Sequence, residues 1–219
     1  MINKALFLAG ATFTLVAASP VIAASPVIAA SPVVAASPVE RVQTLPKEKV
    51  LLALDVKFHR QIGKNSCGAA ILHSVLSYWG SKDADQRGLL KKHPPSSKEG
   101  DYSLGEMKRI AKGLGFKAYV VQATESFIKK QLRLGRPVIV PVTLEYGKEK
   151  LKSLGVGEEE YRKISEKHDL RYNHFLALIG LGKDSIVVLD PAKGIYLIDK
   201  KELERKRAPH KDAALLLAL

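Results

Sequence analysis

The chain has 219 residues, and its 35 lysines and arginines exceed its 22 aspartates and glutamates by 13, so it is strongly basic at neutral pH. This length fits one compact domain with a tail and excludes a multidomain assembly. A single cysteine excludes an intramolecular disulfide framework and an all-cysteine metal site.

Residues 1–24 are predicted to form a signal peptide. A short basic start, Met1 to Lys4, precedes an uncharged and mostly apolar stretch from Ala5 to Ala18. Such a stretch is typical of a secretory signal and is short for a membrane span, and small residues suited to a cleavage site follow it. We therefore expect an exported protein, periplasmic or extracellular. The alternative is an uncleaved membrane anchor, for which the apolar run would have to extend to about residue 36.

Residues 25–40 are predicted to form a linker. They belong to an Ala/Ser/Pro/Val repeat in which prolines recur every six residues, at positions 20, 26, 32 and 38. Regular prolines prevent a continuous helix, so an extended, semi-rigid spacer is expected. The folded domain is then residues 41–219, which retain the whole excess of positive charge.

Three helices are predicted in the first half of this domain. The first runs from Cys67 to Trp79, where apolar residues recur at helical spacing before a glycine. The second begins after Ser103, which forms a capping-box pattern with Glu106, and the third covers residues 124–134.

Strands are predicted mainly in the second half, at residues 138–144, 174–181, 185–190, 195–198 and 213–219. Because the helices come first and the sheet second, an α+β domain is favoured over alternating β-α-β units. The polar segment 145–172 is too long for a hairpin turn and is expected to contain a helix of its own.

Cys67 is the candidate nucleophile because it begins a predicted helix. The unpaired N–H groups and the positive dipole end at a helix start favour the ionised thiol, which is the nucleophilic form. A cysteine nucleophile also needs a base, and a third group usually holds that base in place. The hairpin that follows offers His174 and Asp190 for these two roles.

His174 and Asp190 are predicted to lie directly opposite each other. The turn of the hairpin is centred near Gly182, midway between them, and directly opposed residues have Cβ atoms about 4.5–5.5 Å apart. A one-residue change in register would invalidate this pairing. Each residue also has a structural interpretation, since an aspartate before a proline often starts a turn and a histidine at a strand start is often structural.

Four motifs in order resemble the bacteriocin-processing, double-glycine cysteine peptidase family of the papain-like superfamily. They are Gln61-Ile62-Gly63-Lys64-Asn65-Ser66-Cys67-Gly68-Ala69-Ala70, Tyr78-Trp79-Gly80, His174-Phe175-Leu176-Ala177-Leu178 and Asp190-Pro191-Ala192-Lys193-Gly194. The resemblance extends from about residue 56 to the C-terminus. It implies a papain-like α+β fold, with the nucleophile at the start of a helix that packs on an antiparallel sheet.

The resemblance also implies a catalytic set. Cys67 would be the nucleophile, His174 the general base and acid, Asp190 the group that orients His174, and Gln61 a donor to the oxyanion. The expected activity is hydrolysis of peptide bonds without a cofactor or metal, with cleavage of leader peptides after Gly-Gly as the inherited specificity. A peptide or protein substrate is expected, and association with a membrane or an exporter is a further expectation.

Two other functions stay open from the sequence. A papain-like peptidoglycan amidase or endopeptidase would use the same order of cysteine and histidine, although its usual Asp-Cys-Ser-Gly motif is replaced here by Ser66-Cys67-Gly68-Ala69. An inactive, peptide-binding relative is the other alternative. Nucleic-acid binding is not expected, because the basic clusters are mixed in sign and lack interleaved aromatic residues. The sequence indicates no oligomeric state.

Overall fold

The computed structural model describes residues 45–219 except 83, 98–99, 146, 148–150, 152–154, 156 and 168–169. The described residues belong to one compact unit that spans Glu40–Leu219. The predicted signal peptide and linker lie outside the described residues and stay predictions, as does the boundary at residue 41. Within the described part of the chain, no helix is both long and apolar enough to cross a membrane.

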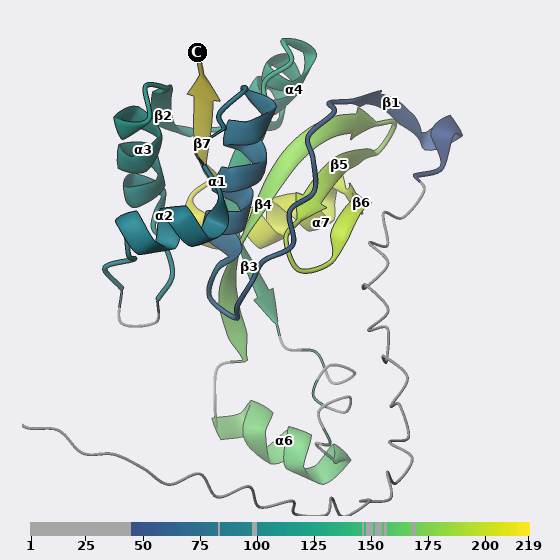
Figure 1. Ribbon diagram of the computed structural model, residues 1–219. Helices are drawn as coiled ribbons and strands as arrows, with labels where there is room; N and C mark the ends of the chain where they lie inside the picture. Colours follow the sequence, from purple (N-terminus) through teal and green to yellow (C-terminus); the bar gives the residue numbers. More distant parts are fainter. Residues whose placement is uncertain are drawn as a thin grey trace, which may run out of the picture. The chain divides into compact units, whose positions relative to one another are not determined.

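In the described part of the chain, seven strands form one antiparallel sheet (Figure 1). Six of them follow the order β2-β7-β3-β4-β5-β6, and β1 pairs with the far end of β4. The strands are β1 (Val50–Ala53), β2 (Lys117–Gln122), β3 (Val138–Glu145), β4 (Arg171–Gly182), β5 (Ser185–Asp190), β6 (Gly194–Asp199) and β7 (Ala213–Ala218). The long strand β4 is therefore central, and it carries His174 near its beginning.

Helices cover both faces of this sheet, and a separate hydrophobic core lies between the helices and the sheet on each face. One core joins α1 (Cys67–Tyr78), α2 (Gln86–Lys92) and α3 (Leu104–Gly113) to the face that includes Ala177 and Leu189. The other core joins α4 (Glu125–Arg133) and α7 (Lys200–Arg207) to the face that includes Val140 and Leu176. Helix α6 (Glu158–Lys167) lies in the connection between β3 and β4 and buries none of its residues.

Local sequence signals explain where these helices begin. Ser103 and Glu106 form the predicted capping box at the start of α3, and Thr124 caps α4 by accepting a hydrogen bond from the Phe127 N–H. Helix α1 begins at Cys67 as predicted, but the Ser66 hydroxyl makes no cap bond to it. That hydroxyl instead contacts both the N–H and the carbonyl of Gly63, closing the turn that precedes Cys67.

The predicted α+β organisation is confirmed, with one correction to the order of elements. Strands β1 and β2 precede the rest of the sheet, and β2 lies between α3 and α4. Neither strand was predicted, because both are short and their apolar residues follow one another without alternating with polar ones. The short helices α2 and α7 also went unpredicted, since α2 has seven residues with a glycine among them and charged residues dominate α7.

The hairpin of β4 and β5 contains a second correction. Ala177 pairs with Leu189 and Leu178 with Val188, but Gly180 pairs with Val187, so the register shifts between Leu178 and Gly180. Continued beyond Leu189, this register places Asp190 opposite Leu176, two residues from His174. The predicted direct opposition of His174 and Asp190 is therefore wrong, because the turn is centred beyond Gly182, where Leu181 pairs with Ile186. The bulge at the register shift reduces the resulting offset by one residue, from three to two.

Candidate active site

Cys67 lies at the first position of α1 with its side chain almost fully buried, 4% exposed. The first N–H groups of a helix have no partner within it, so they can stabilise negative charge at this point. The next residue, Gly68, lets the helix approach closely, since an added Cβ would lie 3.1 Å from the Tyr102 Cβ and 3.5 Å from a ring carbon of Phe175. A glycine at this position therefore holds Cys67 against the segment of β4 that carries His174.

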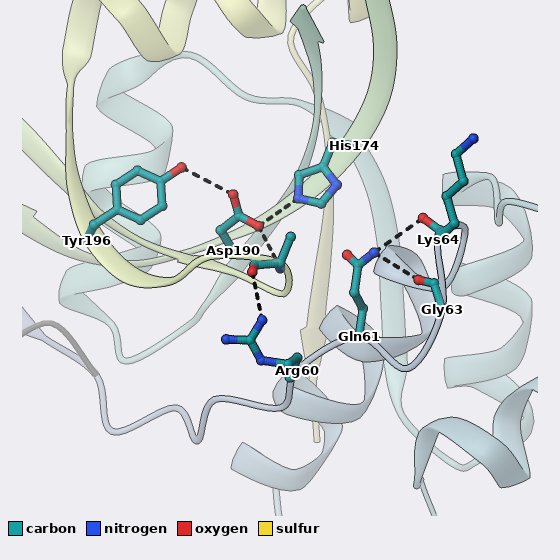
Figure 2. A network of polar contacts seen from close by, with 8 residues as sticks. Arg60, Gln61, Gly63, Lys64, His174, Asp190 and Tyr196 are labelled. Atoms are coloured by element: carbon teal, nitrogen blue, oxygen red, sulfur yellow. Dashed lines mark hydrogen bonds and ion pairs between the residues drawn. The ribbon is translucent and has the colours of Figure 1, made fainter. Parts of the chain in front are cut away.

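His174 and Asp190 form a buried pair, with 2.8 Å between His174 Nε2 and Asp190 Oδ1 (Figure 2). Both side chains are buried, at 6% and 0% exposure. Asp190 Oδ1 also accepts a hydrogen bond from the Ala192 N–H at 2.8 Å, and the Tyr196 hydroxyl donates to Oδ2 at 3.4 Å. The carboxylate is thus fixed from three directions and in turn fixes the imidazole.

The electrostatics of the pair favour a protonated His174. Burial alone would lower the pKa of the ring, but hydrogen bonds and charge interactions with Asp190 and Cys67 outweigh burial and raise this pKa to about 9. Burial opposes ionisation of Asp190 as well, yet the contacts to His174 and the Ala192 N–H leave its pKa below the ordinary value. At neutral pH the His174 ring is therefore protonated, and it interacts with both the Asp190 carboxylate and Cys67.

The loop before Cys67 carries Gln61, whose amide nitrogen donates to the carbonyls of Gly63 at 2.9 Å and Lys64 at 3.2 Å. Figure 2 shows the amide turned toward these two carbonyls, with its oxygen on the side of the His174–Asp190 pair. That oxygen is buried and has no hydrogen-bond partner among the described residues. In this arrangement the amide N–H groups support the turn, so a role for Gln61 at the oxyanion stays a prediction that requires rotation of the side chain.

Gln86 was not predicted, and it holds this loop in place. The buried Gln86 side chain donates to the Arg60 carbonyl at 2.7 Å and accepts from the Ile62 N–H at 3.2 Å, so it binds the backbone on both sides of Gln61. The Gln61 N–H itself donates to the Pro191 carbonyl at 2.9 Å. The loop that precedes the nucleophile is thereby joined to the loop that follows Asp190, a link that no local sequence pattern reveals.

A cleft opens on both sides of Cys67 and His174. One part, which we call the Tyr102 half, has a volume of about 690 Å³ and is lined by Tyr102, Pro141 and Phe175 among others. The other, the Gln61 half, has a volume of about 620 Å³ and is lined by Gln61, Lys64, Asn65, Tyr172 and Lys193 among others. Cys67, Asp101, Asn173 and His174 line both halves. An extended peptide could therefore cross the cysteine with residues seated on either side.

Glu106 shapes the wall of the Tyr102 half. Its Oε1 accepts from the N–H and hydroxyl of Ser96, and its Oε2 from the N–H and hydroxyl of Ser103, at 2.7–2.8 Å. These bonds outweigh the effect of burial and lower the pKa of Glu106 to about 2. One carboxylate therefore holds both ends of the 96–103 loop, whereas the sequence indicated only its capping bond to Ser103.

The other histidines have ordinary contacts where the structure describes them. His59 and His73 stack with ring centroids 3.7 Å apart, and burial together with His59 lowers the pKa of His73. His210 contacts the Thr143 hydroxyl at 3.0 Å and lines the Tyr102 half of the cleft, a position that its sequence context did not suggest. His168 lies outside the described residues.

Comparison with known protein families identifies the family of the chain. The model of the Peptidase_C39 like family matches residues 53–207, which include Gln61, Cys67, His174 and Asp190. The chain belongs to this family. The resemblance found in the sequence motifs is thus confirmed, and so is the predicted papain-like fold. No curated protein matches the chain.

Solved structures of C39 peptidase domains share this fold. A C39-like peptidase candidate from Bacillus anthracis is 17% identical, with a TM-score of 0.57 over 78% of this chain and 98% of that one. A double-glycine motif protease from an AMS/PCAT transporter, in complex with the leader peptide, is 20% identical, with a TM-score of 0.52 over 76% and 94%. The peptidase domain of Streptococcus ComA, a bifunctional ABC transporter of a quorum-sensing pathway, is 22% identical, with a TM-score of 0.50 over 74% and 98%.

Proposed function

We propose that the protein is an exported cysteine peptidase that hydrolyses peptide bonds through Cys67, His174 and Asp190. The single observation that carries the proposal is the buried hydrogen bond between His174 and Asp190, formed where the same ring also interacts with Cys67 at the start of α1. Membership of the C39-like family supports the same reaction class.

The geometry suggests how each group acts. The Cys67 thiolate would attack the peptide carbonyl, and the Cys67 N–H at the helix start could donate to the developing oxyanion. His174, which holds a proton at neutral pH, would give it to the leaving amine, leaving the neutral ring to activate the water that hydrolyses the thioester. Asp190 keeps the ring oriented and stabilises its charged form throughout.

The substrate we propose is a peptide with an extended segment, with cleavage after Gly-Gly as the first specificity to test. The cleft on both sides of Cys67 suits an extended chain. A similar fold occurs in a double-glycine motif protease that was solved with the leader peptide, which favours testing leader sequences first. Export through residues 1–24 is part of the proposal and is tested separately, by N-terminal sequencing of the mature protein.

Thiol labelling tests the catalytic pair directly, because Cys67 is the only cysteine and any label reports on it alone. Purified protein would be treated with iodoacetamide from pH 5 to pH 10, alongside His174→Ala. We expect wild type to react at pH 6.5 and the variant to react more slowly at that pH, by about tenfold or more. The difference between the two labelling rates should narrow above about pH 9. Equal profiles would mean that the fold is present without an activated cysteine.

Turnover is then measured on a fluorogenic peptide with Gly-Gly at its centre. Cys67→Ser keeps the size of the side chain but removes the thiolate, so hydrolysis should fall to background. The matched control is Ser165→Ala on α6, whose hydroxyl bonds only the nearby Arg162 carbonyl among the described residues. Hydrolysis that survives in Cys67→Ser would contradict the proposed mechanism. Release of muropeptides from purified cell wall would instead favour the amidase alternative.

A further inference from the structure

The two halves of the cleft differ in charge. Two lysines, Lys64 and Lys193, line the Gln61 half. None of the described residues that line the Tyr102 half is a lysine or an arginine. This contrast arises in a chain with 35 lysines and arginines, and among the described residues that line the cleft the lysines lie on one side of the nucleophile.

The lysine side chains of the Gln61 half are available to a ligand. Both are exposed, and neither takes part in an ion pair among the described residues. Arg60 adds a third cation at the same rim, where its guanidinium donates to the Ala192 carbonyl at 3.2 Å, next to Lys193 (Figure 2). Arg60, Lys64 and Lys193 therefore belong to the two segments, residues 60–64 and 190–193, that contact each other at this side of the cleft.

Two carboxylates, Asp190 and Asp101, also line the Gln61 half, and the charge of Lys193 interacts with that of Asp190. Asp190 is fully buried and is bonded to His174, the Ala192 N–H and the Tyr196 hydroxyl. Asp101 lines both halves. Among the described residues, a peptide that crosses Cys67 thus meets lysines in the Gln61 half only.

We propose that Lys64 and Lys193 determine specificity, by selecting peptides that place a carboxylate in the Gln61 half of the cleft. The proposal rests on the proposed peptidase function and adds a substrate class to it. A carboxylate could come from an aspartate or glutamate side chain or from the C-terminus of a short peptide, and the test separates these two sources. The physical basis is the attraction of opposite charges at a partly exposed site, which favours the acidic ligand and weakens with salt.

The test uses quenched fluorogenic peptides that differ at one residue. Aspartate, asparagine or lysine is placed at each of the three positions on either side of the scissile bond, and the C-terminus is amidated. A further peptide ends in a free carboxylate two residues beyond the bond. We expect kcat/KM to favour aspartate over asparagine by roughly threefold to tenfold on one side of the bond only, with the preference reduced in 500 mM NaCl.

Charge reversal assigns the preference to the two lysines. Lys64→Glu with Lys193→Glu should reverse it, so that the lysine peptide becomes the better substrate. The matched control is Lys91→Glu with Lys112→Glu, which changes the net charge equally at exposed residues that line neither half of the cleft. This control should keep the preference for aspartate. A preference that falls equally in both double variants would mean general attraction to a basic protein and would overturn the proposal.

Binding to Cys67→Ala separates this proposal from the proposed function. Fluorescence anisotropy with the aspartate and lysine peptides reports on the cleft without turnover. We expect Cys67→Ala to bind the aspartate peptide more tightly, and the same protein with Lys64→Glu and Lys193→Glu added to prefer the lysine peptide. This result supports the specificity proposal even if wild type hydrolyses nothing and the peptidase function fails. Hydrolysis with no charge preference, and equal binding of both peptides, would overturn the specificity proposal while leaving the peptidase function in place.

Discussion

His174 and Asp190 bond at 2.8 Å although the register of their hairpin offsets them by two residues. Residues two apart on a strand point to the same face, so His174 and Leu176 share a face, and Leu176 is the residue that the register places opposite Asp190. The contact is therefore a diagonal one, which long side chains can span. The imidazole reaches along the sheet to the carboxylate rather than straight across it.

Replacing Asp190 with asparagine should weaken catalysis through His174. The amide keeps the size of the carboxylate but removes the negative charge that raises the pKa of the ring, so that pKa should fall well below 9, because burial still opposes the charged form. We expect kcat to drop by about 100-fold or more. NMR titration of His174 and the pH dependence of kcat measure the two effects.

Tyr196→Phe is the matched control for Asp190→Asn. It removes only the 3.4 Å bond to Asp190 Oδ2. We expect a change in kcat of less than about fivefold, because a long hydrogen bond contributes little. An Asp190→Asn variant with an unchanged His174 titration would mean that the carboxylate does not control the ring.

Gln61→Ala separates two roles for this amide. If the side chain rotates to donate to the oxyanion, kcat should fall by roughly 100-fold or more with KM little changed. If it only supports the turn through the carbonyls of Gly63 and Lys64, the free energy of unfolding should fall by about 1 kcal/mol and kcat should change only slightly. Steady-state kinetics and urea unfolding of the same preparation distinguish these results.

Glu106→Gln should reduce stability in a way that depends on pH. The folded pKa of Glu106 is about 2, below its ordinary value of 4.5, so its contribution is complete above pH 4.5 and is lost as pH falls toward 2. At pH 7 we expect a loss of about 2 kcal/mol, since the amide cannot accept all four hydrogen bonds. Urea unfolding at pH 7 and pH 3 should show a smaller difference between wild type and variant at pH 3.

The His174 pair predicts the opposite dependence at alkaline pH. The folded pKa of about 9 lies above the ordinary value of 6.5, so the stabilisation is complete below pH 6.5 and is lost as pH rises through 9. Between pH 6 and pH 10 wild type should lose on the order of 1–3 kcal/mol more than His174→Gln, which cannot titrate. Parallel unfolding curves for the two proteins across this range would contradict the raised pKa.

Much of the fold was predictable because its signals are local. The start of α1 at Cys67, the capping box of Ser103 with Glu106, and the strands on both sides of the hairpin turn each depend on neighbouring residues. The edge strand β2 escaped prediction because most of its residues are exposed, and its place beside β7 depends on residues almost a hundred positions away.

The sequence by itself was enough to predict the three residues of the candidate site and their order, because Cys67, His174 and Asp190 each stand in a recognisable local pattern. Only the tertiary structure decided how they meet. The position of the hairpin turn together with the bulge in β4 set the diagonal pairing of His174 with Asp190, the Gln86 clamp joined two distant loops, and folding placed Lys64 and Lys193 on the same side of the cleft. These relations depend on contacts between residues far apart in the chain, whose geometry is set by packing rather than by local propensity.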